Sequence, residues 1–146
     1  MAARIEPHLT LIHDVVDHDQ VEPLVGAAAE ATAPFTVRLT GAAHWGRPIH
    51  GIYLVVDDPA GHTAALHGRL AELEDPAWSR GSFRPHVTVV HGRTVTADAA
   101  HAAWLALDGF HAGWDVVVDA IDVLELVEPR WRLVGRVPLT GRDEGA

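Results

Sequence analysis

The sequence lacks cysteine and long apolar runs, and each absence excludes a class of protein. Without cysteine the chain forms no disulfide, binds no metal through thiolates and carries no cysteine nucleophile, so redox chemistry is not expected. No apolar run approaches the roughly 18 residues of a membrane span, and the N-terminus lacks the basic and then apolar layout of a signal peptide. We therefore expect a cytoplasmic protein with no membrane partner.

Positive charge is also scarce. The 11 basic residues are all arginine and stand against 20 acidic residues, which gives a formal net charge of -9. Proteins bind long nucleic acids largely by neutralising phosphates, so a chain this acidic is a poor candidate for that function. A small molecule or a terminal phosphate is a better match.

Length and periodicity predict one domain with two similar halves. The 146 residues, 48% of them hydrophobic, suffice for a single continuous core, and we expect a monomer with one domain over residues 1–146 and halves at about 1–78 and 79–140. The first half is expected to hold a strand at 5–12, a helix at 20–31, strands at 35–39 and 51–56 around a turn at 41–48, and a helix at 60–74 with Glu74 facing water. After a loop at 75–84, the second half is expected to hold a strand at 87–91, a helix at 97–107, and strands at 116–118, 121–126 and 131–137.

The strands that open the two halves carry the same residue pattern. Residues 7–13 read PHLTLIH and residues 85–91 read PHVTVVH. Proline, threonine and both histidines recur in register, and the other three positions are aliphatic in both copies. About 0.7 His-x-Thr triplets are expected by chance from this composition, whereas chance repetition of the whole pattern is on the order of 10⁻⁴. The repeat therefore indicates a shared role.

That pattern places a base beside a hydroxyl on each strand. Because side chains alternate faces along a strand, His8 and Thr10 share one face, and His86 and Thr88 do likewise. If the halves pack about a pseudo-twofold axis, the four side chains meet across a cleft. Phosphodiester cleavage requires such a set: a neutral imidazole takes a proton from the attacking water, an imidazolium protonates the leaving oxygen, and the hydroxyls bind the non-bridging oxygens. Since imidazole titrates near neutral pH, both roles are available without a metal.

With these two motifs the chain resembles the two-histidine phosphoesterase superfamily, whose members carry two His-x-Thr/Ser motifs and include the bacterial RNA 2',3'-cyclic phosphodiesterases, also called 2'-5' RNA ligases. The resemblance extends from the first motif to the closing strand. It implies a bilobal α+β fold with two pseudo-symmetric strand-helix-strand-strand halves and antiparallel sheets around a central cleft. It also implies a phosphoric diester hydrolase that opens a cyclic phosphate without a cofactor, with His8 and His86 catalytic and Thr10 and Thr88 binding the phosphate.

Further residues are candidates for binding the substrate. Tyr53 lies on the expected strand 51–56, where the family often places an aromatic side chain near the substrate, and Arg84 precedes His86 by two residues. Arg80, Trp45 and Trp78 are expected in loops, where the arginine could meet a phosphate and the indoles could stack on a base. Because the chain is acidic and shorter than typical RNA-directed members, we expect a 2',3'-cyclic nucleotide, a short RNA end or a sugar-linked cyclic phosphate as substrate.

Two other classes of function stay open. His13 and His91 recur with the motif, and a metal site of His8, His13, His86 and His91 is one alternative, although strand alternation turns His13 and His91 to the opposite face, where a structural or cleft-rim role is expected. The second alternative is a non-catalytic module that binds a phosphorylated ligand, since a sequence does not demonstrate turnover.

Overall fold

The computed structural model describes residues 6–78, 81, 83–107, 110–128 and 130–143. It is an α+β fold in which short helices flank antiparallel sheets. The elements, in chain order, are a 3-10 turn η1 (His18–Gln20), α1 (Val21–Glu30), β1 (Phe35–Trp45), β2 (Gly51–Asp57), α2 (His62–Leu70), a 3-10 turn η2 (Ala71–Leu73), β3 (His86–Val90), α3 (Ala97–Ala106), β4 (His111–Val118), β5 (Ala120–Val127) and β6 (Arg130–Pro138).

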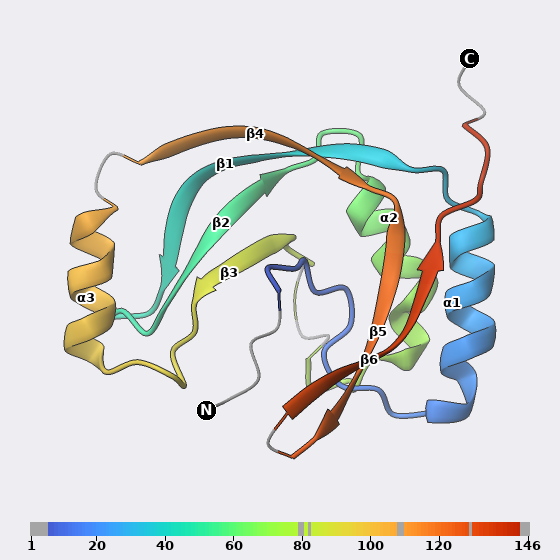
Figure 1. Ribbon diagram of the computed structural model, residues 1–146, viewed down its shortest axis with the longest axis horizontal. Helices are drawn as coiled ribbons and strands as arrows, with labels where there is room; N and C mark the ends of the chain where they lie inside the picture. The colour runs from blue at the N-terminus through green and yellow to red at the C-terminus, as the bar shows by residue number, and fades with distance from the viewer. Residues whose placement is uncertain (1–5, 79–80, 82, 108–109, 129, 144–146) are drawn as a thin grey trace.

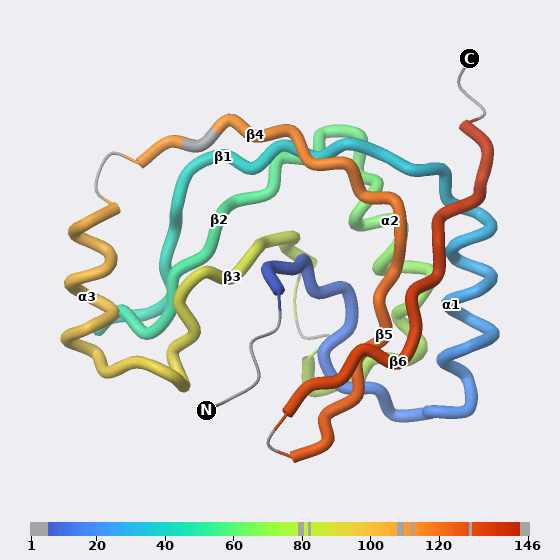
Figure 2. Tube along the Cα trace, viewed as in Figure 1, coloured from blue at the N-terminus to red at the C-terminus, as the bar shows by residue number. Residues whose placement is uncertain are grey.

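Four of these strands form one curled sheet in the order β3-β2-β1-β4, with every neighbouring pair antiparallel. Figure 1 shows the sheet as an arch, with α3 at one end and α1 and α2 at the other. Strands β5 and β6 form a separate antiparallel pair. The larger sheet therefore combines strands from both halves of the sequence, and the N-terminal segment lies beneath the arch beside β3, as the trace in Figure 2 shows.

The main core lies where α1 and α2 pack against the sheets. In α1 the buried residues Val25, Ala28 and Ala29 follow the i, i+3, i+4 spacing of an amphipathic helix, and they join Leu66 and Leu70 of α2 in the same cluster. A smaller cluster lies under α3. Helices at both ends of the arch thus cover apolar residues of the sheet.

Side chains from the preceding turns stabilise two helix starts. Thr96 Oγ1 accepts a hydrogen bond from Ala99 N at 3.2 Å at the start of α3. Before α2, Asp58 Oδ2 accepts from the Thr63 backbone N at 2.7 Å and from Thr63 Oγ1 at 2.8 Å. Partial burial alone would raise the pKa of Asp58, but the hydrogen bonds from Thr63 outweigh it and hold that pKa below its ordinary value. The carboxylate thus satisfies amide donors that the helix itself leaves unpaired.

The N-terminal segment differs from the prediction. Residues 5–12 were expected to form a strand, and those among the described residues make only an isolated antiparallel bridge, Leu9 to Val87, with a second bridge from Val15 to Glu74 further along. Residue 5 lies outside the described residues. An apolar run becomes a strand only where successive residues find partners in a ladder, and along the outer edge of β3 only Leu9 pairs, with Val87. The first motif is therefore anchored by one bridge rather than by a ladder.

Two further element boundaries in the first half were wrong, and in the second half β4 begins at His111, five residues before the strand expected at 116–118. The expected turn at 41–48 begins later, because β1 continues to Trp45 and changes register against both neighbours between Leu39 and Ala42. Gly41, which suggested a turn, lies at this irregularity, and glycine inside a strand is typical of one. The helix expected at 60–74 ends at Leu70 and continues as η2, which brings Glu74 into the interior instead of into water.

Candidate active site

A single bridge brings the two motifs together. Leu9 pairs with Val87 in an antiparallel bridge, so by the geometry of such pairs His8 lies opposite Thr88 and Thr10 lies opposite His86. In a regular ladder, opposite side chains have Cβ atoms about 5 Å apart, and diagonal ones, the relation of His8 to His86 in this register, are about 7–8 Å apart. This register puts the four polar side chains of the repeat on one face of the bridge.

The same bridge separates the polar side chains from the core. Val87 is only 9% exposed and belongs to the main apolar cluster, and Leu9 packs against that cluster. Because neighbouring residues point to opposite faces, the histidines and threonines on either side of Leu9 and Val87 point away from the core. Thr10, His86 and Thr88 are half-buried and His8 is exposed.

Each motif histidine is held in the same way. His8 Nδ1 lies 2.9 Å from the backbone oxygen of Glu6, and His86 Nδ1 lies 2.8 Å from the backbone oxygen of Arg84. In both motifs the partner is the carbonyl two residues earlier. A carbonyl oxygen only accepts, so Nδ1 carries the proton and donates it, and a neutral ring then leaves Nε2 as a bare acceptor. The two imidazoles are thus oriented alike, with Nε2 available to a ligand.

Two aromatic rings flank His86. The centroid of Trp45 lies 5.1 Å and that of Tyr53 lies 5.4 Å from the imidazole centroid, and both meet it edge-on. Trp45 and Tyr53 also touch each other, with centroids 4.3 Å apart. Strand pairing accounts for this grouping, since Tyr53 is the partner of Thr88 and Trp45 is the partner of Gly51. The side chain of Trp45 lies so close over Gly51 that a Cβ there would be 2.6 Å from its ring.

Other candidates lie around this centre. The side chain of Arg84 is exposed, and its backbone carbonyl oxygen accepts from the imidazole of His86, whereas Arg80 lies outside the described residues. His13 stacks on Trp78 with centroids 4.8 Å apart, and His91 Nδ1 accepts from the backbone N of Arg93 at 3.1 Å. The histidines at the last position of each motif, His13 and His91, therefore have partners of their own.

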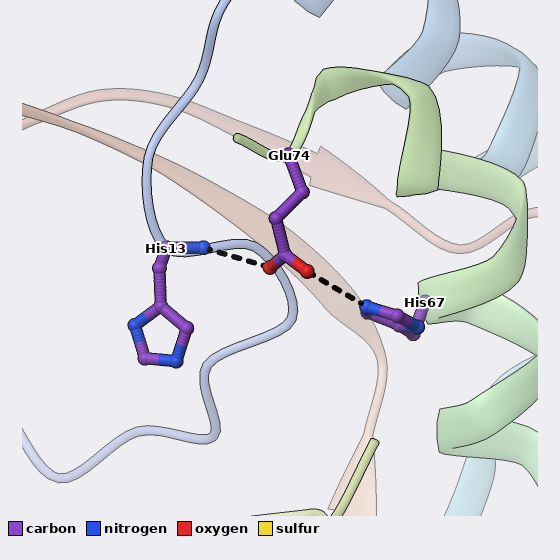
Figure 3. Close-up of polar contacts among 3 residues, drawn as sticks. All are labelled: His13, His67 and Glu74. Carbon is purple, nitrogen blue, oxygen red and sulfur yellow. Dashed lines mark hydrogen bonds and ion pairs between the residues drawn. The ribbon is translucent and has the colours of Figure 1, made fainter. Parts of the chain in front are cut away.

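Trp45 and Glu74 are the residues whose positions the sequence did not predict. Trp45 was expected in a loop and is instead the last residue of β1. Glu74 was expected in water and is 7% exposed, with its carboxyl group between His13 and His67 (Figure 3). The glycines on either side of Trp45 favoured a turn, so the sequence did not predict that β1 continues to this residue. Nothing in the local pattern of 60–74 indicates a buried carboxyl group.

Within the described ranges, no three histidine, cysteine, aspartate or glutamate side chains gather closely enough to hold a metal ion. The four-histidine site considered from the sequence therefore has no assembled ligand set there. No helix in this part of the chain is long and apolar enough to cross a membrane.

Similar solved structures define the class of fold. TT0787 of Thermus thermophilus matches with a TM-score of 0.64 and 16% identity, over 94% of this chain and 80% of that one. Escherichia coli LigT complexed with 3'-AMP matches with a TM-score of 0.59 and 20% identity, over 92% and 78% of the two chains. A structure described as a phosphoesterase matches with a TM-score of 0.56 and 18% identity, over 92% and 78%. The fold is therefore that of the two-histidine phosphoesterases.

The family follows from a separate comparison. The family model of the 2'-5' RNA ligase superfamily matches residues 1–129, and this chain belongs to that superfamily, as the paired motifs predicted. No curated protein matches the chain.

Proposed function

We propose that this protein opens a cyclic phosphate by hydrolysis without a metal ion, with His8 and His86 as general base and general acid. One observation carries the proposal. The two imidazoles come from the two copies of the repeat, share one face beside the Leu9 to Val87 bridge, and are each held at Nδ1 by the carbonyl two residues earlier. Equivalent restraint of both rings leaves both Nε2 atoms for a single substrate.

The reaction uses the two rings in opposite protonation states. The neutral imidazole takes a proton through Nε2 from a water molecule, whose oxygen forms a bond to phosphorus. The bond from phosphorus to one ribose oxygen breaks, and that oxygen takes a proton from the other ring, which starts as an imidazolium. The product is a phosphate monoester. The proton gained by the first ring returns to solvent or to the second ring before the next turnover.

Thr10 and Thr88 are proposed to hold the phosphate. Their hydroxyls form no hydrogen bond with any described residue, and each lies opposite a motif histidine by the register of the bridge. Hydroxyl donors aimed at the non-bridging oxygens stabilise the charge that builds up there in the transition state. On this proposal the two hydroxyls bind the phosphate from the same segments that carry the motif histidines.

Tyr53 and Trp45 are proposed to border the substrate on the His86 side, and Arg84 to meet its phosphate or rim. The rings present half-buried aromatic surface beside the imidazole, and such surface stacks on nucleobases. LigT, a structural neighbour, binds 3'-AMP, which is the monoester that forms when the 2' bond of a 2',3'-cyclic adenylate breaks. A 2',3'-cyclic nucleotide, or the cyclic end of a short RNA, is the substrate class that we propose.

The direct test is hydrolysis of 2',3'-cyclic AMP in excess EDTA, followed by phosphorus NMR. We expect conversion of the cyclic phosphate signal to a monoester signal, with a bell-shaped dependence of kcat/KM on pH, because one ring must be neutral while the other is charged. Activity that disappears in EDTA and returns with zinc would favour a metal-dependent enzyme. Tight binding of 3'-AMP with no turnover of any cyclic phosphate would favour a binding module.

A further inference from the structure

A buried carboxyl group connects the segments that carry the two motifs. Glu74 is 7% exposed, and Figure 3 shows its carboxyl group between His13 and His67. The backbone N of His13 donates to Oε2 at 3.3 Å, and His67 Nε2 lies within hydrogen-bond reach of Oε1 at 3.4 Å. A buried carboxyl group is costly unless its oxygens have partners, and here one partner comes from each side of the site.

The first connection fixes the end of the first motif. His13 is the seventh residue of that motif, and its amide is tied to Glu74 rather than to a neighbouring strand. Two backbone hydrogen bonds join the same two segments: Asp75 N donates to Asp14 O and Val16 N donates to Leu73 O, each at 2.9 Å. With only an isolated bridge at Leu9, the first motif is positioned by this contact together with these backbone hydrogen bonds.

The second connection leads to His86. His67 stacks on Phe83 with centroids 4.3 Å apart and planes 6° apart. Phe83 directly precedes Arg84, whose carbonyl oxygen accepts from His86 Nδ1. The stacked ring of His67 therefore restrains the backbone that orients the second histidine, and the carboxyl group of Glu74 restrains His67.

We infer that Glu74 is a positioning residue that sets both motif histidines relative to each other, through His13 on one side and His67 with Phe83 on the other. This inference rests on the proposed function of His8 and His86. Glu74 touches neither ring and takes no part in proton transfer. Misplacement of a reacting group by about 1 Å costs on the order of 100-fold in rate, so a contact that fixes both segments controls turnover more than ligand binding.

The test compares two substitutions at Glu74 with a control elsewhere. Glu74→Met keeps the length of the side chain and removes both contacts, whereas Glu74→Gln can still accept from the His13 amide and pair with His67. Val25→Ala, in the buried face of α1, is a control that lowers stability without touching the site. All variants are assayed on 2',3'-cyclic AMP at a temperature at least about 15 °C below their Tm, so that loss of folded protein does not lower the rate.

We expect Glu74→Met to lower kcat by about 10- to 100-fold, Glu74→Gln to retain most of it, and Val25→Ala to leave kcat unchanged. KM should move much less than kcat, since the phosphate-binding hydroxyls remain. If Glu74→Met lowers Tm as Val25→Ala does and leaves kcat unchanged, the carboxyl group is only structural and the inference is wrong.

A second readout separates this inference from the proposed function. Inorganic phosphate is titrated into protein labelled with nitrogen-15, and the imidazole signals of His8 and His86 are followed by NMR. We expect phosphate to shift both signals in the wild type, and Glu74→Met to alter the His86 Nδ1 signal while Glu74→Gln preserves it. If the wild type binds phosphate but turns nothing over, the proposed function fails, and the His86 signal still decides whether Glu74 positions that ring.

Discussion

Replacing Gly51 with alanine should displace Trp45 and thereby impair the site beside His86. A Cβ at Gly51 would lie 2.6 Å from Cε3 and 3.1 Å from Cζ3 of Trp45, and 3.3 Å from the backbone oxygen of Val90. Carbon atoms pack best at about 3.5–4.0 Å, so the indole must retreat by about 1 Å. The backbone of Val90 on the other side is fixed in β3, so the indole ring of Trp45 moves relative to Tyr53 and His86.

Two effects should follow from this displacement. Overpacking of this kind typically costs about 1–3 kcal/mol of stability. A shift of about 1 Å beside a reacting imidazole should lower kcat/KM by roughly 10- to 100-fold. Combining Gly51→Ala with Trp45→Phe makes room for the methyl group. The loss of stability and of kcat/KM in the double variant should therefore be smaller than the sum of the losses in the two single variants.

The matched control is the same substitution at a glycine with free space. A Cβ at Gly68, inside α2, meets nothing within 4 Å. Gly68→Ala should therefore stabilise the protein by about 0.5–1 kcal/mol, because alanine loses less backbone entropy in a helix, and should leave turnover unchanged. Urea unfolding and steady-state assays measure both quantities. Equal stability and equal kcat/KM for Gly51→Ala and Gly68→Ala would refute the placement of Trp45 against the site.

Three further outcomes are expected. Thr10→Val and Thr88→Val keep the β-branched shape and remove a phosphate donor, so each should lower kcat by about 10- to 1,000-fold, measured on 2',3'-cyclic AMP; unchanged kcat would remove these hydroxyls from the phosphate site. His13→Gln and His91→Gln should cost less than His8→Ala or His86→Ala in the same assay. Asp58→Ala should cost about 0.5–2 kcal/mol at pH 7. Since the pKa of Asp58 is lowered in the folded state, its contribution is complete above about pH 4 and is lost as pH falls through that lowered pKa, so urea unfolding should show the two proteins converging in acid.

Much of the second half of the fold could be predicted from the sequence. The alternating run after Pro85 forms β3, the alanine-rich run before residue 107 forms α3, and the three closing strands form β4, β5 and β6. In these segments the local pattern and the tertiary partners agree, which is the condition for reading structure from periodicity. The motif could be recognised in the sequence because it recurs, since neither copy is distinctive alone.

The structure of the first half was harder to predict from the sequence, because it depends more on tertiary partners than on local pattern. The apolar residues of the first motif suit a strand, yet the segment finds only Val87 and Glu74 as bridge partners. Glu74 was assigned to water from helical spacing, but the helix ends at Leu70 and the chain then turns inward. Trp45 was assigned to a loop because glycines surround it. For the first motif and for Glu74 a contact far along the chain overrides the local propensity, whereas Trp45 is held in β1 by its pairing with Gly51, six residues later.

The central claim is that His8 and His86 carry the chemistry, and the most direct measurement is the rate of 2',3'-cyclic AMP opening by the wild type, by His8→Ala, by His86→Ala and by the double variant, in EDTA. General acid-base catalysis contributes about 10²- to 10⁴-fold per group, and two groups that serve one step are not additive. We predict that each single variant loses activity within that range and that the double variant is little worse. Turnover close to that of the wild type in either single variant would contradict the assignment of the chemistry to the repeated motif.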